Sequence, residues 1–189
     1  PVQAILALRE AGKISAERAD DIANIHCDVP EWYVALVFEP AGPKAAPRTP
    51  YEARFSAAWT MARALLDGNL DVWSFGPEKL ADPLALELAR RTTYKAEALP
   101  EFPAAFPARV TVTMKSGEKH VQYIAHNLGT PGNPMSAEDI GAKFLACAAP
   151  ALGEVRAHEV SQSIDALPQD ESAARLFRVL RKLEVATRR

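Results

Sequence analysis

Cysteine is scarce in this sequence, since only Cys27 and Cys147 are present among 189 residues. The two lie far apart, at apolar positions of a predicted strand and a predicted helix, and neither has other ligands around it at metal-binding spacing. This pattern excludes a disulfide framework. It predicts two buried free thiols in a protein of a reducing compartment.

Long apolar runs are also absent. No run of about 18 apolar residues is available to span a bilayer. The first residues lack the basic and apolar parts of a signal peptide. We therefore expect a cytoplasmic protein with no membrane partner.

Charge of one sign is not in excess, because 22 lysines and arginines are matched by 24 acidic residues, for a net charge of -2. Such a balance gives no long-range attraction to nucleic acid, which we exclude as a partner. The sequence contains neither a phosphate-binding loop nor a dinucleotide fingerprint, so we expect no cofactor. We also expect no metal site, because no two histidines have the helical i, i+4 spacing of ligands; the four are His26, His120, His126 and His158.

Apolar residues make up 48% of the chain, which is long enough to bury a core. We expect one domain over residues 1–189. Two-residue alternation predicts a strand over residues 25–29 and a hairpin over residues 109–126. The fold class we expect is α+β, with helices packed on a small antiparallel sheet. The predicted helices cover residues 2–11 and 15–21, open at Pro77 and Pro83, and start at Ser136, Glu154 and Glu171.

The strongest local signal is a helix start at Thr49. Thr49 and Glu52 have the spacing of a capping box, and Pro50 stands at the first helical position. Gly68 supplies the stop, so we expect one helix from Pro50 to the residue before it. The proline-rich stretch over residues 40–50 predicts an irregular loop. The buried face of the helix is predicted to hold Tyr51, Phe55, Ala58, Trp59, Ala62, Leu65 and Leu66.

Several blocks along the chain, in this order, resemble the C-terminal domain of the MmgE/PrpD family, typified by 2-methylcitrate dehydratase. The blocks are Glu52-Ala53-Arg54-Phe55-Ser56, Leu65-Leu66-Asp67-Gly68, Leu80-Ala81-Asp82-Pro83, Phe106-Pro107-Ala108-Arg109-Val110, and Gly129-Thr130-Pro131-Gly132-Asn133-Pro134-Met135-Ser136 leading into Ala142-Lys143-Phe144. The large helical N-terminal domain of the family, with most of its catalytic residues, is missing. The chain also does not begin with methionine, so we expect a piece of a longer or split protein.

The resemblance implies a cofactor-independent lyase or isomerase that acts on a small polycarboxylate, as in propionate metabolism. A proton next to a carboxylate is removed, and water or carbon dioxide is lost or the proton returns on the other face. The base and acid would come from the N-terminal domain, while this lid-type domain closes the site. The implied partners are that domain, the substrate and a second copy in a homodimer. We expect the chain alone to be inactive. The competing hypothesis is a noncatalytic dimerisation or scaffold module.

Three residues near the predicted helix start are candidates for substrate binding: Arg48, Arg54 and Ser56. A helix N-terminus with guanidinium groups nearby suits a carboxylate, because amides and a bidentate donor meet it together. The alternative is an exposed Arg54 paired with Glu52 or Asp67, with Ser56 facing solvent.

Tyr33 is the candidate catalytic residue. Decarboxylating members of the family carry a functional tyrosine in this stretch, and Tyr33 is its nearest match. A phenol here could donate a proton or a hydrogen bond to a substrate carboxylate. The alternative is aromatic packing of Tyr33 with its neighbour Trp32.

Overall fold

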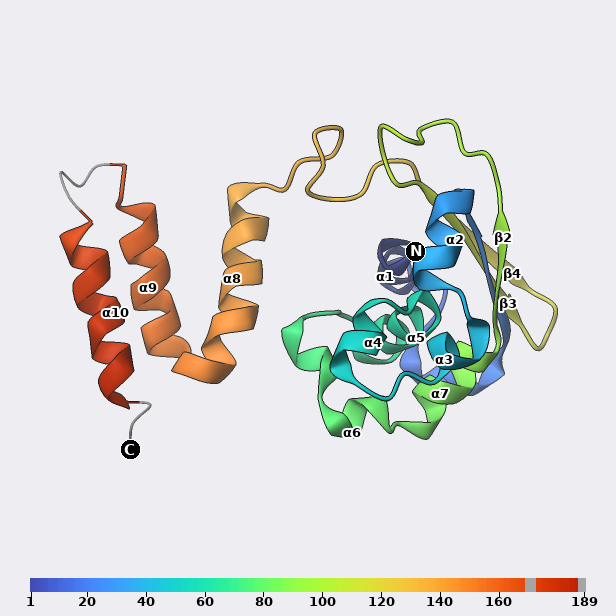
Figure 1. Ribbon diagram of the computed structural model, residues 1–189, viewed down its shortest axis with the longest axis horizontal. Coiled ribbons are helices and arrows are strands. Elements are labelled where there is room, and N and C mark those ends of the chain that lie inside the picture. Colours follow the sequence, from blue (N-terminus) through green and yellow to red (C-terminus); the bar gives the residue numbers. More distant parts are fainter. Residues whose placement is uncertain (169–172, 187–189) are drawn as a thin grey trace. The chain divides into compact units, whose positions relative to one another are not determined.

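The computed structural model describes residues 1–168 and 173–186, with residues 182–186 as backbone only. The chain divides into two compact units, Pro1–Pro134 and Met135–Arg189 (Figure 1). The single C-terminal domain over residues 1–189 stays a prediction, within which these two units are distinguished.

The first unit is built on a four-stranded sheet in the order β2-β1-β3-β4. Strand β1 (Ile22–Val29) pairs antiparallel with β3 (Ala108–Met114), which pairs antiparallel with β4 (Lys119–Ile124). These pairings confirm the predicted strand and hairpin. Strand β2 (Thr92–Ala96) was not predicted, and it joins β1 in parallel, which makes the sheet mixed. Its short, largely exposed sequence carries little apolar alternation.

Helices cover one face of this sheet and confirm the α+β class (Figure 1). The central helix α5 (Ala57–Asp67) is buried along nearly its whole length and packs between α1 (Val2–Glu10) and α7 (Pro83–Arg90). Since β1 and β3 alternate, every second side chain joins the core. The core between helices and sheet includes Ile5, Ile25, Cys27, Val29, Trp59, Leu65, Leu88, Val110 and Val112.

The predicted helix starts at the prolines are confirmed. Pro77 opens α6 (Pro77–Leu80), and Pro83 opens α7, where the Asp82 carboxylate accepts the amides of Leu84 and Ala85 at 3.0 and 3.4 Å. The irregular loop predicted over residues 40–50 is wrong in part, because this stretch contains a short helix, α3 (Ala41–Ala45). The remaining elements of this region are the 3-10 turns η1 (Ala16–Asp21) and η2 (Val72–Phe75) and the helices α2 (Glu31–Val37), α3 (Ala41–Ala45) and α4 (Pro50–Arg54).

The predicted long helix from Pro50 is wrong, because the chain breaks at Ser56 into α4 and α5. In a continuous helix the Trp59 amide would bond to the Phe55 carbonyl, four residues earlier. Instead the Ser56 hydroxyl accepts a hydrogen bond from the Trp59 amide at 2.9 Å, and the Phe55 carbonyl accepts one from the Lys44 ammonium at 2.6 Å. This exchange of partners ends one helix and caps the next.

The break also moves the first apolar positions out of the core. Tyr51 is 71% exposed and Phe55 is 37% exposed, so neither is buried as predicted. The later positions of the predicted face lie on α5, and of these Trp59 and Leu65 are fully buried. Phe55, the C-cap of α4, therefore lies at the surface.

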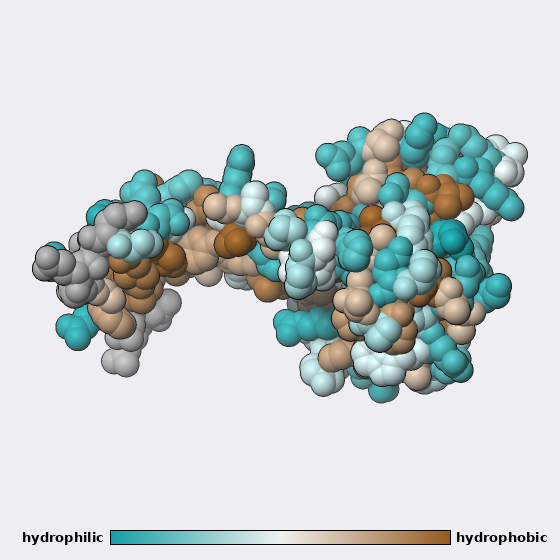
Figure 2. All heavy atoms as spheres, turned by 90° about the horizontal axis from the view of Figure 1, so that it is seen from above, coloured by the Kyte–Doolittle hydropathy of each residue, from teal (hydrophilic) through white to brown (hydrophobic). Residues whose placement is uncertain are grey.

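The second unit consists of helices α8 (Ala137–Leu152), α9 (Glu154–Asp165) and α10 (Ala174–Ala186). Ser136 and Asp139 form the predicted capping box of α8. The start predicted at Glu171 lies outside the described residues. Among the residues whose exposure is described, this unit buries only Ala157, Val160 and Ser163 and leaves Ile140, Val155 and Phe177 more than half exposed. Apolar side chains are visible along its surface in Figure 2.

Candidate functional site

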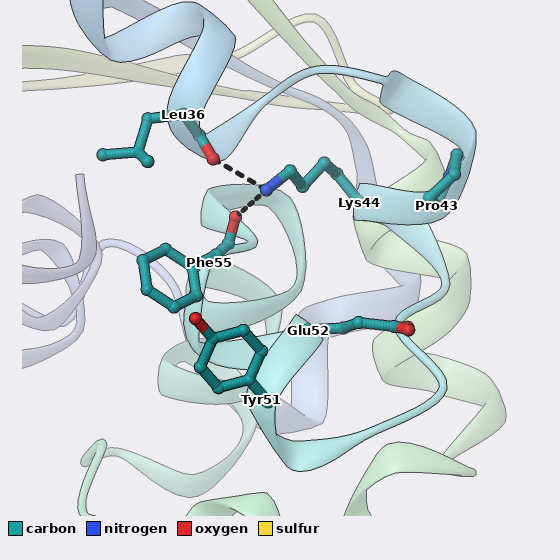
Figure 3. A pocket seen from close by; sticks show the side chains of 6 residues that line it. All are labelled: Leu36, Pro43, Lys44, Tyr51, Glu52 and Phe55. Carbon is teal, nitrogen blue, oxygen red and sulfur yellow. Dashed lines mark hydrogen bonds between the residues drawn. The ribbon is translucent and has the colours of Figure 1, made fainter.

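The candidate site lies where the chain winds from β1 through α2, α3 and α4. Lys44, on α3, extends its ammonium group between two helix ends and donates to the carbonyl of Leu36 at 2.7 Å and of Phe55 at 2.6 Å (Figure 3). Leu36 lies in the last turn of α2, and Phe55 is the C-cap of α4. Carbonyls at these positions lack partners within their own helices, so one side chain satisfies both ends.

A pocket of about 470 Å³ opens beside this lysine. Its walls are mainly apolar, and the Tyr51 and Phe55 rings that form one wall have centroids 5.2 Å apart. Burial lowers the pKa of the Lys44 ammonium. The pocket therefore presents an apolar surface with one ammonium and one carboxylate at its rim (Figure 3); its lining residues are Leu36, Pro43, Lys44, Tyr51, Glu52 and Phe55.

Ser56 lies close to this pocket but points into the protein. Its side chain is buried, and its hydroxyl donates to the Lys44 carbonyl while accepting the Trp59 amide. Both interactions are with backbone groups, which explains the serine as a structural residue and overturns the alternative of a solvent-facing filler. A substrate-binding role for Ser56 stays a prediction.

The two candidate arginines lie on the surface. Arg48 has a side chain that is 87% exposed and stands 3.7 Å from the Glu52 carboxylate. Arg54 is exposed, and its guanidinium carbon lies 5.5 Å from the centroid of the Phe75 ring, a cation–π contact. The pairing of Arg54 with Glu52 or Asp67 is not what the structure shows. Glu52 faces Arg48, and Asp67 bonds to Arg63 and Lys79.

The predicted helix N-terminus is a weak anion site in this structure. Helix α4 has only five residues, and its Glu52 amide is already taken by the Thr49 hydroxyl at 3.1 Å. Glu52 returns a bond to the amide of Arg48 at 2.7 Å rather than to that of Thr49. The guanidinium groups, and not the helix dipole, are thus what this region offers to a carboxylate.

Tyr33 lies on α2 and is half-buried against the core. Its ring centroid is 6.2 Å from that of Trp32 and 6.3 Å from that of Phe106. Burial raises the pKa of the Tyr33 phenol, so the group keeps its proton at neutral pH and can act as a donor. The aromatic packing expected as the alternative is present, and the catalytic role of Tyr33 stays a prediction.

Sequence reasoning missed two charged groups of the first unit, the half-buried Lys44 and the buried Arg63. Lys44 was assigned to the loop, and only its position between two helix C-termini would have marked it. Arg63 is 3% exposed, and its guanidinium bonds to Asp67 at 2.7 Å and Asp82 at 2.6 Å. The i, i+4 spacing of Arg63 and Asp67 was a signal that could have found this cluster.

Of the four histidines, His26 is held by two side chains of the sheet, while the His120 side chain is only 9% exposed. His26 lies 2.9 Å from the Thr93 hydroxyl and 3.1 Å from an Asp28 carboxylate oxygen. Across the described parts of the chain, no group of three or more His, Cys, Asp or Glu side chains could hold a metal ion. In the same parts, no helix is long and apolar enough to cross a membrane.

Comparison with known proteins agrees with the resemblance in the sequence. Cis-aconitate decarboxylase of Mus musculus is 28% identical over 166 residues, which cover 86% of this chain and 32% of that protein. The chain thus spans about a third of the length of this curated relative. Residues 1–169 match the MmgE/PrpD C-terminal domain, and a C-terminal domain implies an N-terminal partner domain in the family. The chain belongs to the MmgE/PrpD family, as its C-terminal domain.

Proposed function

We propose that this chain is the lid-type C-terminal domain of a cofactor-independent lyase or isomerase that acts on a small polycarboxylate. The observation that carries the proposal is the family match over residues 1–169. The name of the mouse relative states a decarboxylation of cis-aconitate, a tricarboxylate. Chemistry next to a carboxylate is therefore the reaction class we assign.

Two side chains of this domain suit such a substrate. Arg54 presents an exposed guanidinium, which can bind a carboxylate through two parallel hydrogen bonds. Tyr33 presents a phenol that is protonated at neutral pH and can donate a hydrogen bond to a carboxylate or to a developing oxyanion. We assign Arg54 to substrate binding, with the exposed Arg48 as a second cation, and Tyr33 to catalysis.

The N-terminal helical domain supplies the remaining groups in this proposal. It provides the base that removes a proton next to the carboxylate and the acid that assists loss of water, returns the proton, or protonates the carbon that carbon dioxide leaves. Closure of the present domain over the site excludes water. We further propose a homodimer in the cytoplasm, with propionate metabolism as one setting for the reaction.

The test is a substrate assay on the protein extended by an N-terminal helical domain of the family, with the 189-residue chain alone as control. Cis-aconitate and 2-methylcitrate are followed by NMR in heavy water, which separates loss of carbon dioxide, loss of water and exchange of a carbon-bound proton. We expect one of the three reactions with the extended protein and none with the chain alone. If the extended protein converts neither compound, the noncatalytic module becomes the better account.

A further inference from the structure

Lys44 links its own helix, α3, to three other helices through a small set of backbone and hydroxyl groups. Its ammonium donates to the carbonyls of Leu36 and Phe55, eight and eleven residues away in the sequence. Its own carbonyl accepts the hydroxyl of Ser56, twelve residues away. Side chain and backbone of one residue therefore tie α3 to the end of α2, to the end of α4 and to the start of α5.

The position suits a cation in particular. The last carbonyls of a helix have no partners within it, and an ammonium group carries three hydrogens that it can donate to them. Lys44 meets two such ends at once (Figure 3). A methionine of similar length and a carboxylate have no hydrogen to donate to these carbonyls.

The two helices whose ends Lys44 holds also carry the two residues assigned to the substrate: Tyr33 in the first turn of α2 and Arg54 at the end of α4. Tyr33 stands three residues before Leu36, on the same side of α2. Arg54 directly precedes Phe55 at the end of α4. A shift of either helix end would displace one candidate group relative to the other.

We propose that Lys44 is a positioning residue of the candidate active site: it fixes the Tyr33 helix relative to the Arg54 helix without contacting the substrate. This inference rests on the proposed function for its catalytic consequence. Its structural consequence stands apart from that function. Loss of the ammonium loosens α2 and the α4–α5 junction together and leaves the sheet intact.

Hydrogen exchange on the 189-residue chain directly tests whether Lys44 holds α2 and the α4–α5 junction in place. Lys44→Met is compared with Lys13→Met, a matched change at an exposed lysine. We expect amide exchange in residues 31–37 and 50–56 to accelerate about tenfold or more in Lys44→Met, with β1 and β3 unchanged. Exchange in residues 31–37 that matches the Lys13→Met protein would overturn the proposal.

Kinetics of the extended protein test the catalytic half. Lys44→Met should lower kcat/KM about tenfold, and Lys44→Arg should restore it to within about threefold, because a guanidinium can also reach two carbonyls. Combined with Arg54→Ala, Lys44→Met should lower kcat/KM little further than Arg54→Ala alone, since a positioning residue acts through the group it holds. Two losses that multiply would contradict this, as would Lys44→Met kinetics equal to those of Lys13→Met.

The two halves separate the possible failures. An extended protein that converts no polycarboxylate defeats the proposed function, while the exchange comparison still decides whether Lys44 braces the helices. A loosened α2 in Lys44→Met together with full activity defeats the positioning role and leaves the proposed function in place.

Discussion

Ser56 donates its hydroxyl hydrogen to the backbone carbonyl of Lys44 and accepts the amide of Trp59 with the same oxygen. The first bond connects α3 to the start of α5, and the second caps the N-terminus of α5. A residue that the family block Glu52–Ser56 marks for the substrate is thus committed to the backbone in this fold. The block has a structural reason to hold a small hydroxyl residue at this position, whatever else it does.

Replacing Ser56 by alanine should therefore destabilise the chain. Ser56→Ala removes a helix cap and a buried hydrogen bond, and we expect a loss of about 2 kcal/mol in the free energy of unfolding. Thr49→Ala removes only the cap of the short, exposed α4 and should cost about 0.5 kcal/mol. Urea unfolding of the two variants checks the order. Equal losses would mean that the bond to Lys44 contributes nothing.

The buried guanidinium of Arg63 should matter more than any surface ion pair. Arg63→Ala leaves Asp82 and Asp67 without their shared cation, and breaking such a buried cluster should cost about 3 to 5 kcal/mol. The matched control is Arg18→Ala, whose arginine is 51% exposed beside Asp21 and should change stability by less than about 1 kcal/mol. Chemical denaturation near neutral pH would compare them. A cost for Arg63→Ala as small as that of the control would contradict a structural role for the cluster.

The same cluster should make stability depend on pH. Burial alone would raise the pKa of Asp82, but the hydrogen bonds from Arg63 and from the amides of Leu84 and Ala85 outweigh it and lower that pKa. The folded state therefore holds the charged form more tightly than the unfolded state, so this stabilisation is complete above about pH 4 and is lost as the pH falls through the folded-state pKa.

We expect Asp82→Asn to unfold with a shallower loss of stability on acidification than the parent. Unfolding free energies measured at several acidic pH values provide the comparison. An unchanged slope would show that Asp82 does not carry this part of the acid response.

The sequence pattern predicted most elements of the first unit because their signals are local. Alternation gave β1 and the hairpin, and Asp82 with Pro83 gave the start of α7. The helix break at Ser56 has no such local signal. At the Phe55 carbonyl, the Lys44 ammonium takes the place that the Trp59 amide would have in a continuous helix, and Lys44 lies eleven residues earlier in the chain. Strand β2 was not predicted for a related reason, because it pairs with β1, which lies far from it in the sequence.

The candidate site shows the same division. The predicted helix start marked Arg48, Arg54 and Ser56, and the family resemblance marked Tyr33, but neither signal gives the direction of a side chain. Only the fold shows that Ser56 points inward, that Arg54 lies over Phe75, and that the Tyr33 phenol is half-buried. The second unit was predicted as helices, but the exposure of apolar positions such as Ile140 does not follow from a local pattern.

The thiol of Cys27 should be inert in the folded protein. The side chain is fully buried in β1, and burial raises the pKa of Cys27 to about 12. We expect no alkylation of Cys27 by iodoacetamide at pH 8 in the native chain and ready alkylation in urea. Mass spectrometry of the Cys27 peptide gives the answer, and rapid native labelling would contradict the buried position. Because the folded thiol keeps its proton, this site also lowers stability as the pH rises above about 9.

The central claim is that this domain contributes carboxylate-binding and proton-donating groups to a lyase or isomerase site. Its most direct test is kcat/KM of the extended protein carrying Arg54→Ala or Tyr33→Phe, with Arg18→Ala as the matched surface control. Both changes keep the core, since Arg54 is exposed and Tyr33→Phe retains the ring. We predict a fall of about tenfold or more in each, because a charged or transition-state hydrogen bond contributes about 1.5 to 3 kcal/mol. Values within about twofold of the control for both variants would contradict the claim and leave the chemistry to the N-terminal domain.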